Sequence, residues 1–95
     1  MTADEQLIAR YIKEDPYLSG EAEVRLTDSL IHVWAVIAQL KVEDWDVAQA
    51  ARDYGIPEVE VQAALAYYRR HQDVLDARIA DHVIVPASAL APTGD

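Results

Sequence analysis

Residues 51–65, "ARDYGIPEVEVQAAL", are the stretch of this chain that decides its fold. Ala51 lies four residues before Gly55, Val61 follows six residues after the glycine, and Ala64 comes three residues later. A small residue lets two helices cross closely, and a glycine permits the left-handed turn between them. The aliphatic residues then hold the second helix against the first. The spacing therefore predicts a helix-turn-helix, an arrangement that many DNA-binding proteins use.

The start of the second helix is poorly suited to reading DNA bases. Base reading favours Arg, Lys, Asn or Gln at the exposed positions there. The chain instead places two carboxylates at these positions, and only Gln62 suits a base edge. The positions are occupied by Pro57, Glu58, Val59, Glu60 and Gln62. Two interpretations stay open, a DNA reader and a helix-turn-helix used only for packing, and the second is favoured.

The N-terminal segment predicts a helix over residues 5–15 that ends at Asp15-Pro16, because the residue before proline avoids helical geometry. Its apolar residues recur with the spacing of one helical face. These residues are Leu7, Ile8, Tyr11 and Ile12. The pair Tyr11-Ile12 also suits a strand, so strand remains the alternative for residues 5–13. Residues 22–26, "AEVRL", predict a short strand.

Residues 30–41, "LIHVWAVIAQLK", are apolar almost all round, which predicts a helix at the centre of the core or of an interface. Thr27, Asp28 or Ser29 is the expected N-cap. A second helix should start after Asp44 or Asp46 and stop at Gly55. Its inward-facing residues would be Val47, Ala50, Ala51 and Tyr54.

Pro57 suits the first turn of the next helix. That helix is predicted to be long, because apolar residues continue at alternating spacings of four and three. The seam consists of Val61, Leu65, Tyr68, Gln72, Leu75 and Ile79. We expect one domain over residues 1–82 and an extended, partly disordered tail over residues 83–95, where prolines and small residues dominate.

Composition limits the classes of partner. The chain has 95 residues, a net charge of −9 and only eight Lys and Arg, which disfavours a general nucleic-acid binder and favours a basic protein partner. No cysteine is present, so neither a disulfide nor a thiolate metal site is expected, as in a reducing cytoplasm. No apolar run of about 18 residues predicts a membrane span. The start, "MTADEQLIAR", does not resemble a signal peptide.

Residues 67–73, "YYRRHQD", carry the densest positive charge of the chain. Arginine beside tyrosine is typical of protein–protein hot spots. The same residues also suit phosphate contacts. The plainer interpretation is a solvated helix face with an Arg69–Asp73 pair four residues apart, which has little energetic weight.

Signatures of enzymes are missing from the sequence. It contains no H-E-x-x-H, no glycine-rich phosphate loop and no G-x-S-x-G. His32, His71 and His82 do not stand at metal-ligand spacing from one another. The sequence therefore predicts a protein that is not an enzyme and has no cofactor or metal. Trp34 and Trp45 are expected to be core or interface anchors.

The chain resembles the domain-of-unknown-function 433 family over roughly residues 8–80. The C-terminal half of the resemblance rests on Ala51, Asp53, Tyr54, Val61, Ala63, Ala64, Leu65, Ala66, Tyr67, Tyr68, His71, Leu75 and Asp76. The N-terminal half rests on Ile12, Asp15, Pro16 and Gly20. The chain departs from the family's "G-T-R-I" pattern, since Leu26 replaces the glycine and Asp28 stands where arginine is usual.

The resemblance implies a mostly α, winged-helix or homeodomain-like domain with short N-terminal extended segments that pair between subunits. Such proteins resemble VapB-type antitoxins, which accompany a PIN-like nuclease toxin. The implied role is to block that toxin as a cytoplasmic homodimer and, in addition, to repress the shared promoter. A helix-turn-helix transcriptional regulator is the alternative.

Three sets of residues follow as candidates. A nuclease's metal-binding carboxylates attract arginine. The candidates for binding the partner are therefore Arg69, Arg70, Arg78 and the neighbouring Tyr67. The candidates for DNA binding are Arg52, Gln62, Arg69 and Arg70. The candidates for the core and the dimer contact are Leu7, Ile8, Tyr11, Ile12, Val33, Trp34 and Ile37.

Overall fold

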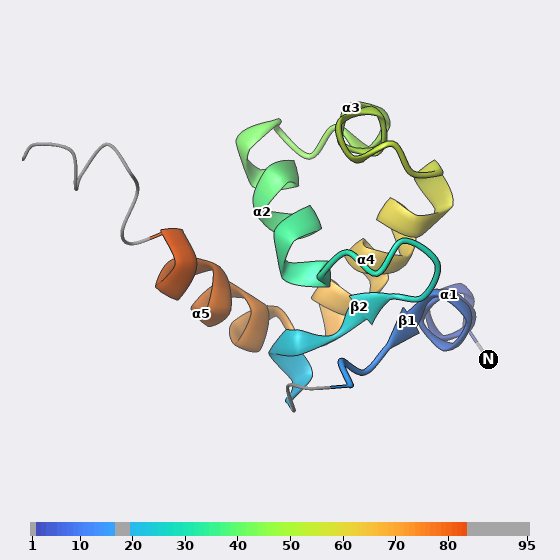
Figure 1. The fold of residues 1–95 in the computed structure, drawn as a ribbon, viewed down its shortest axis with the longest axis horizontal. Helices are drawn as coiled ribbons and strands as arrows, with labels where there is room; N and C mark the ends of the chain where they lie inside the picture. The colour runs from blue at the N-terminus through green and yellow to red at the C-terminus, as the bar shows by residue number, and fades with distance from the viewer. Residues whose placement is uncertain (1, 17–19, 84–95) are drawn as a thin grey trace, which may run out of the picture.

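Five α-helices and a two-stranded antiparallel sheet make up residues 2–16 and 20–83, the part of the chain that this computed structural model describes (Figure 1). The expectation of a mostly α protein is confirmed. In chain order the elements are α1 (Ala3–Tyr11), β1 (Ile12–Lys13), the 3₁₀-helix η1 (Glu21–Glu23), β2 (Arg25–Leu26), α2 (Val33–Val42), α3 (Val47–Tyr54), α4 (Glu58–Arg70) and α5 (Gln72–Val83).

The N-terminal segment is helix first and strand afterwards, so each of the two alternatives for residues 5–13 holds in part. Thr2 and Glu5 form a reciprocal capping box that starts α1, with backbone-to-side-chain bonds of 2.7 and 3.1 Å. At Ile12 the backbone becomes extended, and β1 pairs with β2 in the register Ile12 to Leu26. This pairing lies within one chain.

The predicted N-cap of α2 is wrong. Residues 27–29 form the turn that follows β2, where Leu26 donates its N–H to the Ile31 carbonyl at 2.8 Å. The helix begins only at Val33, and His32 at the N-cap position makes no side-chain capping bond. Backbone hydrogen bonds thus hold residues 27–29 in a turn, so none of these residues lies at the N-cap position of α2.

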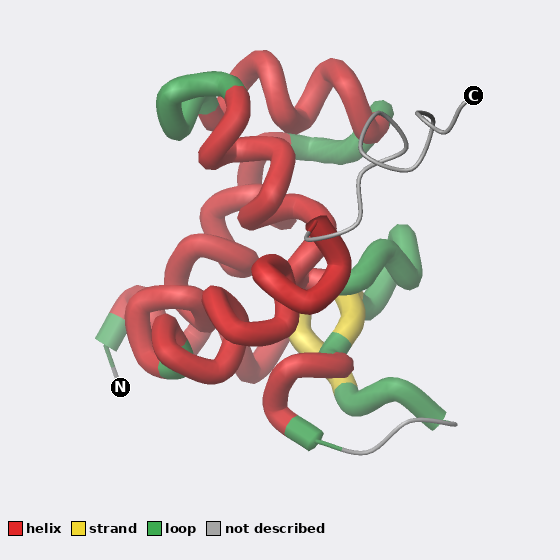
Figure 2. Tube along the Cα trace, turned by 90° about the vertical axis from the view of Figure 1, so that its left-hand side faces the viewer, coloured by secondary structure: helices red, strands yellow, loops and turns green. Residues whose placement is uncertain are grey.

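The core forms where α2 meets α4 and α5. The buried residues of α2 lie on one face of the helix, less than half of its circumference at about 100° per residue. They are Val33, Trp34, Val36, Ile37 and Leu40. Ala35 and Ala38 are partly buried and pack against the same core. Helix α4 packs against α1, α2 and α3, and seven of its thirteen residues are buried. The helices gather on one side of the short sheet (Figure 2).

The α3–α4 pair follows its predicted end signals. Asp46 caps α3 by accepting a bond from the Gln49 N–H at 3.0 Å, and Gly55 ends the helix in the left-handed conformation with φ 66°. Ala51 and Val61 are both buried where the helices pack. That this pair serves as a DNA-reading helix-turn-helix stays a prediction.

The single long helix predicted after Pro57 is wrong, because the chain bends at His71 (φ −133°, ψ 38°) and continues as a separate α5. Neither glycine nor proline marks this bend in the sequence. The new direction buries Leu75 and Ile79 in the core, and α5 packs on α2 and η1. Tertiary packing therefore determines the break, while the apolar spacing still identified the buried positions.

Within residues 2–16 and 20–83, no helix is long and apolar enough to cross a membrane. The tail predicted over residues 83–95 lies outside the described residues, apart from Val83, which is the last residue of α5.

Candidate functional site

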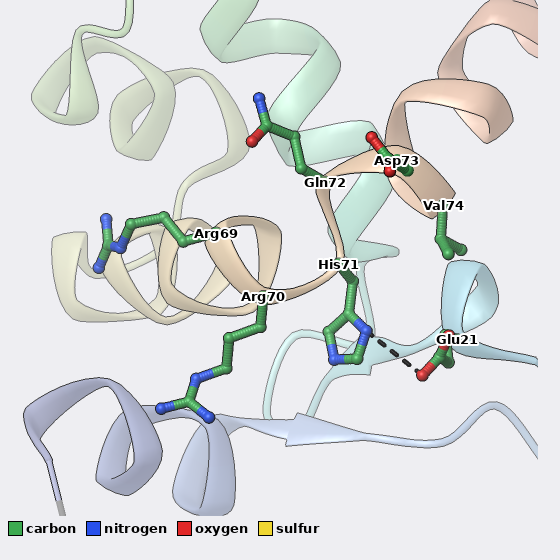
Figure 3. Close-up of a pocket in the computed structure, with 7 residues that line it drawn as sticks. All are labelled: Glu21, Arg69, Arg70, His71, Gln72, Asp73 and Val74. Atoms are coloured by element: carbon green, nitrogen blue, oxygen red, sulfur yellow. Dashed lines mark ion pairs between the residues drawn. The ribbon is translucent and has the colours of Figure 1, made fainter.

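A groove of about 550 Å³ lies at the junction of α4 and α5 (Figure 3). Its lining combines the cationic end of α4, the first turn of α5 and one residue of η1. The lining residues are Glu21, Arg69, Arg70, His71, Gln72, Asp73 and Val74. The groove therefore contains two of the arginines that were predicted to bind a partner.

Arg69 is held by Asp4 of α1 in a two-pronged contact. Its Nε and Nη2 atoms donate to the two Asp4 carboxylate oxygens at 3.1 and 2.8 Å. The hydrogen bond from Arg69 holds the pKa of Asp4 below its ordinary value and raises the pKa of Arg69. The predicted Arg69–Asp73 pair is wrong, because α4 ends between these residues and Asp73 belongs to α5.

Arg70 lies next to Arg69 and points toward α1 (Figure 3). Its Nη2 lies 4.0 Å from a Glu5 carboxylate oxygen and 3.4 Å from the Thr2 hydroxyl. The side chains of Arg69 and Arg70 are 56% and 43% exposed. Ion pairs this exposed contribute only about 0–1 kcal/mol each, so both guanidinium groups are available for exchange with other carboxylates.

Tyr67 connects α4 to η1 through contacts with two residues that line the groove. Its hydroxyl donates to the Glu21 carbonyl at 2.7 Å, and its ring stacks on the imidazole of His71 at 4.2 Å. His71 Nδ1 lies 3.3 Å from a Glu21 carboxylate oxygen. Tyr67 is only 6% exposed, and burial raises its pKa to about 12. Its position is that of a structural link, with little of its ring available to a partner.

We expect this burial to make the fold sensitive to alkali. The folded-state pKa of Tyr67 lies above the ordinary value of about 10, so its contribution to stability is complete below pH 10 and is lost as pH rises toward 12. Tyr67→Phe should cost about 1 kcal/mol at pH 7, through loss of the bond to Glu21. Between pH 9 and pH 11, the free energy of unfolding of Tyr67→Phe should fall by about 1 kcal/mol less than that of the parent chain. Urea unfolding measured across this range checks both effects.

Tyr11→Phe on α1 is the matched control, since that side chain is only partly buried. An equal alkaline loss in Tyr67→Phe and in the parent chain would show that Tyr67 does not carry the effect.

Arg78 is not part of the groove. Its Nε donates to a Glu23 carboxylate oxygen at 2.9 Å, and its guanidinium lies 4.6 Å from the centre of the Trp34 ring. Arg78 thus joins α5 to η1 and α2. Of the three predicted arginines, the structure brings Arg69 and Arg70 together and places Arg78 elsewhere.

The candidates for DNA binding do not form one cluster. Arg52 is exposed on α3 and donates to the Gln49 side chain at 2.8 Å, while Gln62 is exposed on α4. Arg69 lies seven residues beyond Gln62, about 10 Å along the helix. Glu60, expected at the exposed start of a reading helix, is only 4% exposed, because most of α4 is enclosed by other helices.

The candidates for the core and the dimer contact divide between inside and surface. Val33, Trp34 and Ile37 are buried in the core. Ile8 and Ile12 are partly buried and pack against it. Leu7 and Tyr11 are partly exposed on the N-terminal side of the fold.

A buried ion pair that the sequence does not predict joins Asp15 to Arg25. The Asp15 side chain is fully buried, pairs with Arg25 of β2, and lies 3.4 Å from His32 Nε2. In the sequence, Asp15 was a residue of the family resemblance and the predicted end of a helix. That predicted end is wrong, because α1 ends at Tyr11. The antiparallel pairing of β1 with β2 brings Asp15 beside Arg25, a long-range contact that no local pattern records.

Two further polar contacts around α2 were also missed. Asp76 accepts bonds from Lys41 and from the Tyr68 hydroxyl, both at 2.8 Å, which lower its pKa. The interaction between the neighbouring carboxyl groups of Glu43 and Asp53 raises the pKa of Glu43 and lowers that of Asp53. Among the described residues, no group of three or more His, Asp or Glu side chains is arranged to hold a metal ion.

Comparison of the chain with protein-family models, with curated proteins and with solved structures finds no match. The resemblance to the domain-of-unknown-function 433 family stays a prediction.

Proposed function

We propose that this protein is a non-enzymatic, antitoxin-like binding protein that takes carboxylates of a partner protein on Arg69 and Arg70. The observation that carries the proposal is the two-pronged contact between Arg69 and Asp4. It supports the proposal because the guanidinium is already oriented for a carboxylate at the edge of an open groove.

In this proposal, Asp4 and Glu5 occupy the positions on Arg69 and Arg70 that carboxylates of a partner would take. Asp4 and Glu5 come from α1, and both pairs are exposed. A partner whose carboxylates converge on the groove gains two charge-assisted bonds and displaces two weak ones. A PIN-like nuclease, with its metal-binding carboxylates, is the class of partner we propose, and a homodimer is the form we propose for the binding protein.

A transcriptional regulator is the less favoured alternative. The net charge of −9 opposes phosphate binding, and the enclosed α4 leaves few side chains for base contacts. Binding to its own upstream DNA that weakens steeply with salt would favour the regulator. Absent or salt-independent binding would remove it.

Charge reversal in the groove tests the proposed function. Arg69→Glu/Arg70→Glu is expected to reduce recovery of a stoichiometric partner at least about tenfold, because two attractive contacts become repulsive. The measurement is affinity purification from the native host at moderate salt, read by mass spectrometry. Arg52→Glu is the matched control, since Arg52 is an exposed arginine outside the groove. Unchanged recovery with the double variant contradicts the proposal.

Asp4→Asn separates competition from a structural role. If Asp4 occupies the place of a partner's carboxylate, its neutralisation should tighten binding of the recovered partner a few-fold, since Arg69 no longer has to be released from an ion pair. Weaker binding by a folded Asp4→Asn protein would show instead that Asp4 positions Arg69 for the partner.

A further inference from the structure

A second exposed surface lies at the end of α2 and in the loop that leads to α3. Val42 is 81% exposed and Trp45 is 44% exposed. Among the described residues, only Leu30 joins them as a large hydrophobic residue with this much exposure. We call the segment formed by residues 42–46 the Trp45 loop. The two apolar side chains, Val42 and Trp45, are three residues apart in the sequence, and both are exposed.

The backbone of the Trp45 loop is held in an unfavourable conformation. Asp44 and Trp45, with φ of 56° and 64°, are consecutive non-glycine residues in the left-handed region. This conformation costs roughly 1–2 kcal/mol for an ordinary residue and less for aspartate. Trp45 donates its N–H to the Leu40 carbonyl at 2.7 Å, and its ring lies 5.7 Å from that of Tyr68. These contacts fix an indole that is 44% exposed.

Such strain in an exposed loop is a feature of binding sites. A buried tryptophan would compensate for an unfavourable backbone through the area it removes from water. Trp45 gains only part of that compensation because of its exposure. Trp and other aromatic side chains held rigidly at a surface are common anchors of protein interfaces.

Charge around the Trp45 loop indicates the kind of partner. Glu43, Asp44 and Asp46 alternate with the apolar residues, and the nearest lysine in the sequence, Lys41, is already paired with Asp76 at 2.8 Å. Asp44 and Asp46 are exposed. An apolar centre with an acidic rim is complementary to an apolar side chain flanked by Lys or Arg.

We propose that the Trp45 loop docks a basic segment of another protein, which places an apolar side chain against Trp45 and its cations against Asp44 and Asp46. No residue of the Trp45 loop lines the groove that contains Arg69 and Arg70, so this proposal is independent of the function proposed for that groove. A second copy of this chain is disfavoured as the occupant, because a two-fold pairing would bring the acidic rim against itself. Phosphate backbones and anionic membranes are repelled by the same charges.

Selection from a random peptide library tests the proposal on the full chain, with counter-selection on Trp45→Ala. The enriched peptides are expected to carry net positive charge and an aromatic or aliphatic residue. Their affinity should fall at least about tenfold for Trp45→Ala and for Val42→Glu. Asp44→Asn, which keeps a residue tolerant of this conformation, should weaken them several-fold. Leu30→Ala is the matched control, an exposed hydrophobic residue at φ 64° in another turn, and should leave affinity unchanged.

Three outcomes would overturn the proposal. The first is no enrichment over the counter-selected variant, and the second is enrichment of neutral or acidic peptides. The third is a dimer in sedimentation equilibrium that dissociates on Val42→Glu, which would make the surface a contact between copies of this chain. Urea unfolding of each variant separates loss of binding from loss of the fold.

Discussion

Replacing Arg25 with methionine is expected to destabilise the fold by about 3–5 kcal/mol. Methionine retains much of the side-chain volume but removes the guanidinium that pairs with the fully buried Asp15 carboxylate. It also removes the bond from Arg25 to the Leu30 carbonyl at 3.1 Å. A domain of this size has a total stability of roughly 5–14 kcal/mol. The loss is therefore a large fraction of the total free energy of unfolding, which urea titration can measure.

The double variant Asp15→Asn/Arg25→Met tests the reason for this loss. It buries no carboxylate charge, so it should be more stable than Arg25→Met alone. Arg10→Met on the exposed face of α1 is the control and should change stability by less than about 0.5 kcal/mol. A loss below about 1 kcal/mol in Arg25→Met would show that the pair behaves like an exposed one.

The sequence predicted correctly those elements whose ends and burial depend on nearby residues. Asp46 and Gly55 mark the two ends of α3, and both act through bonds within a few residues of themselves. The continuous apolar run of residues 30–41 predicted a helix at the centre of the core or of an interface, and five of the ten residues of α2 are buried in the core. In α3, capping chemistry and burial favour the same conformation, whereas α2 depends on burial, since His32 makes no side-chain capping bond.

Prediction failed where a distant contact outweighed a local preference. Residues 27–29 are good N-caps, but the backbone bonds of the turn after β2 use this segment before the helix begins. The bend at His71 has no local breaker, and only the packing of α5 on α2 and η1 explains it. Patterns of local spacing contain no information on such competition.

The candidate site shows the same division. The pair Arg69-Arg70 was visible as a cluster of charge, and the structure places both residues on one groove. Their acidic partners were not visible, because Asp4 lies 65 residues from Arg69 in the chain. The Trp45 loop was seen only as an aromatic anchor, since its exposure and positive φ angles depend on where α2 and α3 pack.

Leu40→Ala is expected to cost about 2–5 kcal/mol, because the residue is fully buried among the helices and its truncation leaves a cavity. Val42→Ala is the matched control on the same helix. Val42 is 81% exposed, so its truncation should change stability by less than about 0.5 kcal/mol. Urea unfolding of both variants measures the difference. A loss below about 1 kcal/mol for Leu40→Ala would mean that neighbouring side chains move to fill the cavity.

The backbone carbonyl of Leu40 accepts a hydrogen bond from the Trp45 N–H, and this bond remains in Leu40→Ala. Peptide binding at the Trp45 loop should therefore survive in the folded fraction of that variant.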